Sequence, residues 1–183
     1  KPEKTGVKLD DRGFIVVNEF LETSKKNIFA FGDAIGKQMF RHAANREAGI
    51  VWHNANHERK VGMDFSAIPH AVFTHPQIAA VGLKEQEAKQ HYNIRVGVAF
   101  YSQTAMGAAM GNPEGFVKVI VEKETAKILG AHIIGPEASA LIQEITNAMA
   151  TGNGDYEPIA RGIHIHPALN EVVQNAFGNL QPV

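Results

Sequence analysis

The sequence contains no cysteine, and this absence limits the chemistry that the chain can perform by itself. Disulfide bonds, thiolate metal sites and cysteine nucleophiles are all excluded within it. The formal net charge of −1 provides no excess of either sign that would attract nucleic acid or an anionic membrane. We therefore expect neither of these partners.

Long hydrophobic runs are also absent. No segment approaches the roughly 20 apolar residues that a membrane-crossing helix needs. The first residues, KPEKTGVKLDDRG, are polar and do not resemble a signal peptide. We therefore expect a cytoplasmic protein. Its 183 residues, 44% of them hydrophobic and 20% charged, suffice for one globular domain with an attached piece of another.

The first third of the chain has the pattern of an α/β unit. Short β-rich runs at residues 13–17 and 28–31 are followed by Gly32 and Asp33. A glycine after a strand allows a sharp exit, so we expect Asp33 at the carboxyl end of a strand, where open α/β sheets bind their ligands. Residues 39–57 predict a helix. Small residues at helical spacing form its expected packed face: Ala44, Ala48, Val51 and Ala55.

The charged stretch HERKVGMD separates residues 1–62 from residues 63–183, where strands become frequent. We predict strands at residues 68–74, 78–82, 94–101, 116–122 and 128–135, and helices at residues 84–91, 138–151 and 167–177. This order predicts an α+β domain with an antiparallel sheet and helices on one side, preceded by the C-terminal tail of an α/β unit. The second helix has an apolar stripe, interpreted as core or subunit interface: Leu141, Ile142, Ile145 and Met149.

The stretch GIHIHPALNEVVQNAF carries the clearest chemical signal. Proline is favourable in the first turn of a helix, so Pro167 predicts a helix start, with His166 just outside the helix and Glu171 about one turn inside. A carboxylate on one imidazole nitrogen fixes the tautomer and leaves the other nitrogen free as a base. The pattern therefore predicts a proton-transfer pair of His166 and Glu171.

Two other interpretations of this stretch remain open. His166 could cap the helix or fill a gap in the packing. Alternatively, His164 and His166 would point the same way in an extended segment and could bind a metal ion if folding brought His75 and His132 to them. Two ligands do not make a site, so we expect no metal. If the pair instead serves a thiol, that thiol lies outside this chain, because the chain has no cysteine.

Three stretches together resemble a known family. TSKKNIFAFGDA at residues 23–34, IPHAVFTHPQIAAVGL at residues 68–83 and HIHPALNE at residues 164–171 occur in that order. They are similar to the second flavin motif, the start of the interface domain and the active-site signature of the pyridine nucleotide-disulfide oxidoreductases. These are flavoproteins that include dihydrolipoamide dehydrogenase, glutathione reductase and mycothione reductase.

The resemblance implies a division of the chain and a set of site residues. Residues 1–62 would be the incomplete C-terminal segment of an FAD-binding domain, and residues 63–183 the interface or dimerisation domain of a longer enzyme. His166 and Glu171 would be the catalytic acid/base pair. The implied cofactors are FAD with NAD or NADP. The implied cofactor-binding residues are Gly32, Asp33, Met39, Phe40, Arg41 and Pro167, the last of which follows a cis bond.

The resemblance also implies a homodimer in which the histidine serves the redox cysteines of the other subunit. We expect a dihydrolipoamide dehydrogenase-like enzyme that oxidises a dithiol through a disulfide and FAD to NAD. Ala168 and Asn170, together with RHAANREAGIVWHNA, lean toward mycothione reductase, so an NADPH-dependent reductase of the mycothione, glutathione or mercuric type is the alternative. An alternative of another class is a non-catalytic dimerisation module without flavin. This chain alone is expected to be inactive.

Overall fold

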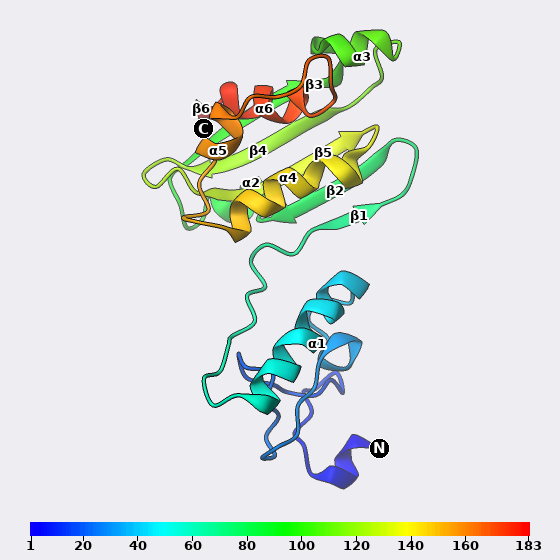
Figure 1. The fold of residues 1–183 in the computed structure, drawn as a ribbon, viewed down its shortest axis with the longest axis vertical. Helices are drawn as coiled ribbons and strands as arrows, with labels where there is room; N and C mark the ends of the chain where they lie inside the picture. The colour runs from blue at the N-terminus through cyan, green and yellow to red at the C-terminus, as the bar shows by residue number, and fades with distance from the viewer. The chain divides into compact units, whose positions relative to one another are not determined.

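The computed structural model describes residues 1–183, except for the side chain of Glu3. The chain divides into two compact units, Lys1–Ser66 and Ala67–Val183, and Figure 1 shows the helices and strands of each unit. Each unit has its own buried residues. None of the helices in the described chain is both long and apolar enough to cross a lipid bilayer.

The first unit contains two 3₁₀ turns, η1 (Pro2–Thr5) and η2 (Gly32–Ile35), and one long helix, α1 (Arg41–Asn56). The runs predicted as strands at residues 13–17 and 28–31 form no continuous strand within the described chain. They make single β-bridges, at Leu9–Ile15, Val17–Thr23 and Glu22–Phe29. Backbone turns with positive φ interrupt the pairing, at Gly13, Leu21 and Asn27.

Helix α1 forms where the sequence predicts it, but its buried face differs from the predicted one. The buried residues are Ala43, Glu47, Ile50 and Asn54. The face is therefore offset by one position from the row of small residues, because two buried polar side chains make hydrogen bonds there. Asn54 donates to the carbonyl oxygens of Phe20 and Val61 and accepts from the Val61 amide. A polar residue with such partners can occupy a helix face that hydrophobicity alone would not select.

The second unit is built on one antiparallel sheet. Its strands are β1 (His70–Val72), β2 (Gln77–Gly82), β3 (Ile94–Phe100), β4 (Phe116–Glu122), β5 (Ile128–Gly135) and β6 (Gln181–Pro182). The order across the sheet is β1-β2-β5-β4-β3-β6, and every neighbouring pair is antiparallel. All five strands predicted for this unit are present. The sixth strand, β6, was not predicted; its residues Gln181 and Pro182 pair with Val96 and Arg95 of β3.

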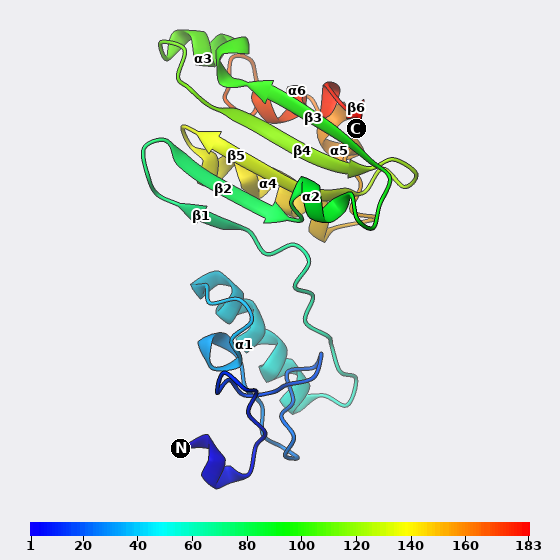
Figure 2. The ribbon, with the colours of Figure 1, turned by 180° about the vertical axis from the view of Figure 1, so that it is seen from behind.

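Helices α4 (Ala138–Ala150) and α6 (Glu171–Gly178) cover one face of this sheet, as Figures 1 and 2 show from opposite sides. Three shorter helices complete the unit, α2 (Glu85–Ala88), α3 (Ala105–Ala109) and α5 (Glu157–Arg161), with the 3₁₀ turn η3 (Tyr101–Gln103). Figure 2 shows α2 on the opposite face of the sheet. The observed architecture is the α+β arrangement that the sequence predicts, except that the short α2 lies on the other face of the sheet. The sequence pattern missed the short elements α3, α5, η3 and β6.

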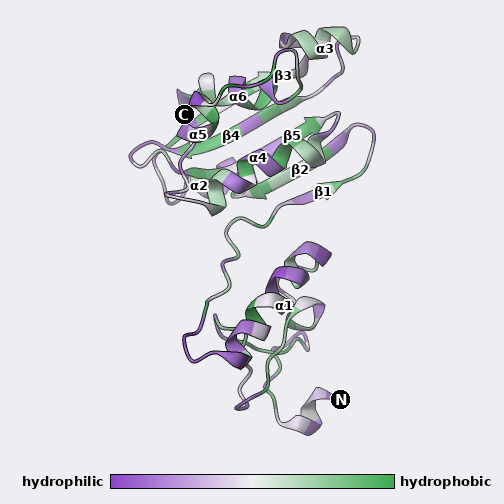
Figure 3. Cartoon of the chain, viewed as in Figure 1, coloured by the Kyte–Doolittle hydropathy of each residue, from purple (hydrophilic) through white to green (hydrophobic). Residues whose placement is uncertain are grey.

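The hydrophobic core lies between the sheet and the two long helices. It is made chiefly by alternate residues of β4 and β5 with the inner sides of α4 and α6: Val117, Val119, Val121, Ala131, Ile133, Ile145, Val172 and Val173. Figure 3 shows hydrophobic and hydrophilic stretches interleaved along α4, as expected for a helix with one buried side. The apolar stripe of α4 is largely covered by the chain's own sheet, because Leu141, Ile142 and Ile145 are buried within this core. The stripe therefore does not require a second subunit to cover it.

Candidate functional site

The segment with the two histidines connects α5 to α6. Helix α5 ends at Arg161, and residues 163–165 have no regular secondary structure in the described chain. The peptide bond between His166 and Pro167 is cis. Helix α6 then begins at Glu171, with Asn170 at its N-cap, and not at Pro167 as the sequence pattern predicts. The helix begins later because the Ala168 amide donates to the Glu171 carboxylate and holds a turn between them.

His166 and Glu171 are in direct contact. Nδ1 of His166 lies 2.8 Å from Oε1 of Glu171. A carboxylate only accepts hydrogen bonds, so Nδ1 carries the hydrogen and Nε2 is the free nitrogen of the ring. The imidazole is 70% exposed and the carboxylate 20% exposed. The free nitrogen of His166 is therefore accessible to a reacting group, while the Glu171 carboxylate is more buried than the imidazole.

Hydrogen bonds keep Glu171 ionised. The Ala168 amide and then the His166 imidazole stabilise the carboxylate, and together they lower the pKa of Glu171 below its ordinary value. Electrostatic attraction from His166 and His164 acts in the same direction. An ionised Glu171 can stabilise an imidazolium at His166 whenever that ring takes up a proton.

Packing of α6 fixes where Glu171 lies. Glu171 is the first residue of this helix, whose inner side is buried against β3 and β4 through Val172, Val173, Ala176 and Phe177. Gln174 on the same helix donates to the carbonyl oxygen of Gly162 at 2.9 Å, which ties α6 to the start of the histidine segment. The packing of α6 against the core of the second unit therefore fixes the position of the His166–Glu171 pair.

The other histidine, His164, has a different partner. Its Nε2 lies 2.9 Å from Oε1 of Glu144 on α4, and its side chain is only 6% exposed. The two imidazoles thus bind different carboxylates and do not form the shared face that an extended segment predicts. Among the described residues, no three histidine, aspartate or glutamate side chains come together to hold a metal ion. The sequence pattern provided no sign of Glu144, which lies 20 positions before its partner.

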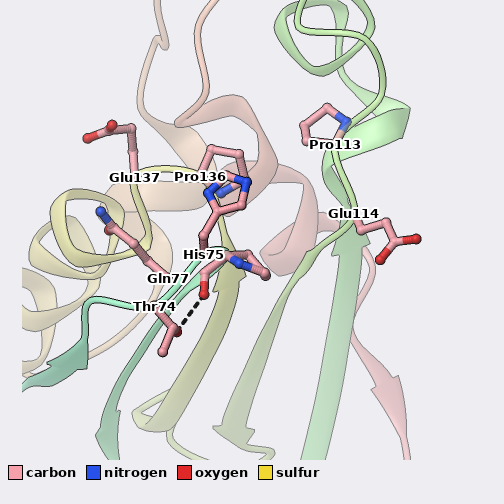
Figure 4. Close-up of a pocket in the computed structure, with 8 residues that line it drawn as sticks. Thr74, His75, Gln77, Pro113, Glu114, Pro136 and Glu137 are labelled. Atoms are coloured by element: carbon pink, nitrogen blue, oxygen red, sulfur yellow. Dashed lines mark hydrogen bonds between the residues drawn. The ribbon is translucent and has the colours of Figure 1, made fainter.

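Figure 4 shows a separate pocket at one end of the sheet. It has a volume of about 480 Å³ and is lined by Thr74, His75, Pro76, Gln77, Pro113, Glu114, Pro136 and Glu137. The Thr74 hydroxyl donates to the carbonyl oxygen of Pro76. Figure 4 shows the carboxylates of Glu114 and Glu137 pointing away from each other. The two carboxylates of the pocket therefore do not converge on one point.

The first unit contains all the residues that the resemblance assigns to cofactor binding except Pro167. Gly32 has φ +66 and begins the η2 turn, which places Asp33 on the surface. Oε2 of the fully buried Glu47 accepts a hydrogen bond from the Gly32 amide at 2.5 Å. The other oxygen of Glu47 has no partner in the described structure. Glu47 was not predicted from the sequence, because a glutamate in a helix usually faces solvent.

Met39, Phe40 and Arg41 lie at the start of α1. Phe40 occupies the N-cap and has no side-chain acceptor for the first amides of the helix, and Met39 is 52% exposed. A helix N-terminus favours electron-rich groups, and the exposed carboxylate of Asp33 can accept hydrogen bonds from hydroxyl groups. Apolar surface, a helix N-terminus and a carboxylate are suited to a ligand with an aromatic ring and a polyol chain. The residues present therefore fit a flavin.

Comparisons with known proteins identify the family of the chain. Residues 68–177 match the pyridine nucleotide-disulphide oxidoreductase dimerisation domain, and residues 1–48 match the family described as pyridine nucleotide-disulphide oxidoreductase. The chain is 42% identical to mycothione reductase of Mycobacterium tuberculosis over 98% of its own length and 40% of the relative's. It is also 42% identical to dihydrolipoyl dehydrogenase of Chlamydia pneumoniae, over 93% of the chain and 37% of the relative.

A solved structure of a flavoprotein disulfide reductase has a similar fold. The fold is similar to that of the HOCl-induced flavoprotein disulfide reductase RclA from Escherichia coli, with a TM-score of 0.84 and 26% sequence identity over 97% of this chain and 41% of that one. The chain spans about 40% of the length of the mycothione reductase and 37% of the length of the dihydrolipoyl dehydrogenase. The dimerisation-domain match covers more than half of the described residues. The chain therefore belongs to the pyridine nucleotide-disulfide oxidoreductases, a family that uses FAD and a pyridine nucleotide, and it contains their dimerisation domain.

Proposed function

We propose that this chain is the C-terminal part of a longer flavoprotein that moves electrons between a thiol–disulfide pair and a pyridine nucleotide. His166 is its acid/base residue, and Glu171 is the partner of His166. The observation that carries this proposal is the 2.8 Å contact between Nδ1 of His166 and the Glu171 carboxylate, with the opposite ring nitrogen exposed. Such an arrangement is suited to repeated proton transfer.

The proposed chemistry of the chain itself is proton transfer at one atom. Nε2 of His166 accepts the proton of a substrate thiol, because a thiolate is the reactive nucleophile. The ring then becomes an imidazolium, and Glu171 stabilises its charge through Nδ1. In the reverse direction, the same nitrogen returns the proton to a leaving thiolate. Each cycle therefore restores the histidine.

The thiols served by His166 belong to another chain in this proposal. The dimerisation domain indicates that the protein assembles into oligomers. We propose a homodimer in which His166 of one subunit faces the redox cysteines of the other, on a segment of the longer protein that lies before Lys1. The exposure of the imidazole supports this, since its free nitrogen needs a group from outside its own unit.

The proposed FAD site lies in residues 1–62. Asp33, on the turn that begins at Gly32, would bind a hydroxyl of the ribityl chain. The amides around Met39, Phe40 and Arg41 would face the polar edge of the ring, as the helix N-terminus favours. When bound, the flavin supplies two-electron transfer between the redox disulfide and the nicotinamide. Pro167 is the one proposed cofactor contact of the second unit.

Dihydrolipoamide is the first substrate that we propose, with NAD as the electron acceptor. The second candidate is a low-molecular-weight disulfide reduced with NADPH. Equal identity of 42% to a dihydrolipoyl dehydrogenase and to a mycothione reductase supports testing both. The shared proton chemistry does not distinguish them, because both substrates are thiol–disulfide pairs.

The test uses the full-length parent as wild type, His166→Ala and His91→Ala, the last being an exposed histidine outside the site. Reduction of NAD by dihydrolipoamide is compared with oxidation of NADPH by disulfides. We expect His166→Ala to lose about 100-fold or more in turnover, the scale of positioned acid/base catalysis, and His91→Ala to match wild type. A flavin-loaded wild type that is inactive in both assays would overturn the proposal.

The alternative class is a non-catalytic dimerisation module. It predicts that the parent assembles normally but is colourless and inactive with every thiol or disulfide. Flavin absorption and sedimentation mass, measured on the same preparation, separate the two possibilities. A yellow dimer supports the enzyme, and a colourless dimer supports the module.

A further inference from the structure

The segment that carries His166 has little support from its own backbone. Residues 163–165 belong to no helix or strand in the described chain. The side chains of Ile163 and Ile165 point to solvent, with exposures of 103% and 78%. Between them, the side chain of His164 is only 6% exposed. His164 is therefore the inward anchor of the segment that ends at the proposed acid/base residue.

Both ring nitrogens of His164 face oxygen atoms that accept hydrogen bonds. Nε2 lies 2.9 Å from a carboxylate oxygen of Glu144, and Nδ1 lies 3.2 Å from the carbonyl oxygen of Gly162. The Gly162 oxygen also accepts from Gln174. A neutral imidazole has one N–H and would leave one nitrogen lone pair against an oxygen lone pair. Turning the ring over would place carbon atoms against both oxygens.

The surroundings of the His164 and Glu144 side chains differ. The Glu144 side chain is one-third exposed, so water can solvate its carboxylate, whereas the imidazole is almost fully enclosed between two acceptors. A second N–H on the ring satisfies both acceptors at once. Glu144 on α4 lies within hydrogen-bond distance of His164, and Glu171 on α6 interacts with His164 at longer range.

We propose that Glu144 and an imidazolium at His164 form a second histidine–carboxylate pair, which fixes the segment bearing His166 to α4. This inference rests on the proposed function, in which His166 is the acid/base residue. His164 and Glu144 are positioning residues: they hold the backbone two positions before His166 while α6 holds its other side through Glu171. The proposed proton donor is thus tied to two separate helices of the core.

The charge of His164 is tested on the 183-residue chain by ¹⁵N NMR of the histidine rings at neutral pH. In wild type we expect both nitrogens of His164 to give the imidazolium signal. In Glu144→Gln, which keeps the shape but removes the charge, we expect one protonated and one unprotonated nitrogen. Glu157→Gln is the matched control, because Glu157 forms an exposed ion pair with Arg161. A neutral His164 in wild type would overturn the proposal.

The positioning role is tested in the full-length parent by turnover and its pH profile. His164→Asn leaves the Glu144 charge uncompensated near the site. We expect kcat to fall about 10-fold with KM little changed, and the acid limb of the pH–rate profile to move to higher pH, because a nearby negative charge holds the proton on His166 more firmly. Flavin absorption identifies folded variants. Unchanged kcat and profile would overturn the positioning role.

These two measurements distinguish the inference from the function on which it rests. The NMR signals of His164 require no turnover, no flavin and no substrate. A wild-type parent without thiol–disulfide activity but with an imidazolium at His164 would overturn the proposed function and leave the ion pair standing. A neutral His164 in an active parent would overturn the inference alone.

Discussion

The carbonyl oxygen of Ala176 occupies the space beside Gly97 that any larger side chain would need. A Cβ atom on Gly97 would lie 2.0 Å from that oxygen. Gly97 is on β3, and Ala176 is on the buried side of α6. This close approach sets the distance between the sheet and the helix whose first residue is Glu171. The position of the proposed catalytic pair therefore depends on a glycine in a strand.

The first prediction concerns this approach. Gly97→Ala should destabilise the second unit by about 3 kcal/mol, since overpacking a tight contact forces the backbone to move. Gly178→Ala on α6 is the control, because a Cβ atom on Gly178 would have no other atom within 4 Å. Urea unfolding of the chain measures both. Equal stability of the two variants would show that α6 adjusts freely over β3.

The second prediction concerns Glu171. In the full-length parent, Glu171→Gln should keep the flavin and the fold but slow thiol oxidation by about 100-fold, because the imidazolium at His166 loses its charged partner. Glu144→Gln should act more weakly, since Glu144 contacts His164 and not the reacting ring. Stopped-flow reduction of the flavin measures the step directly. Unimpaired reduction in Glu171→Gln would remove Glu171 from the mechanism.

The sequence predicted the strands of the second unit and the main site contact because those signals are local. Continuous β-rich runs bounded by glycine and polar residues identify β1 to β5, and Glu171 lies five positions from His166. The later start of α6 was not predictable. It depends on the Ala168 amide, which donates to the Glu171 carboxylate at 2.9 Å and replaces a helical turn. Proline at a possible helix start favours that start only where no competing turn forms.

Long-range polar contacts were missed for a different reason. Glu47 binds the Gly32 amide, and Asn54 binds the backbone of Phe20 and Val61. Glu144 binds the ring of His164. Hydrophobic periodicity assigns such residues to the solvent side of a helix, because it contains no information about distant hydrogen-bond partners. The buried face of α1 was displaced by one residue for this reason.

The third prediction tests one of these contacts. Asn54→Ala should leave the Phe20 and Val61 carbonyls and the Val61 amide without their partner. We expect a loss of about 2 kcal/mol in the first unit, the usual cost of unsatisfied buried polar groups. Native-state hydrogen exchange at the Val61 amide reports it. Asn56→Ala is the control, because Asn56 is exposed and bonds only within its own helix. Unaltered protection of Val61 would contradict the prediction.

The fourth prediction concerns the pH dependence of the second unit. Glu85 on α2 forms ion pairs with Lys118 on β4 and with Lys89, and hydrogen bonds from Lys118 and then Lys89 lower the pKa of Glu85 from 4.5 to about 2. A depressed folded-state pKa contributes stability above pH 4.5, which is lost as the pH falls toward 2.

Glu85→Gln should therefore cost about 1 kcal/mol at pH 7, the upper range for partly exposed pairs. The difference from wild type should shrink as the pH falls below 4.5, because protonated Glu85 resembles glutamine. Glu157→Gln, whose partner Arg161 is highly exposed, should cost little at any pH. Urea unfolding across this pH range measures both variants. The charge of Glu85 links α2 to Lys118 on β4. If the stability difference between wild type and Glu85→Gln stayed constant down to about pH 2, Glu85 would support α2 through packing and not through its charge.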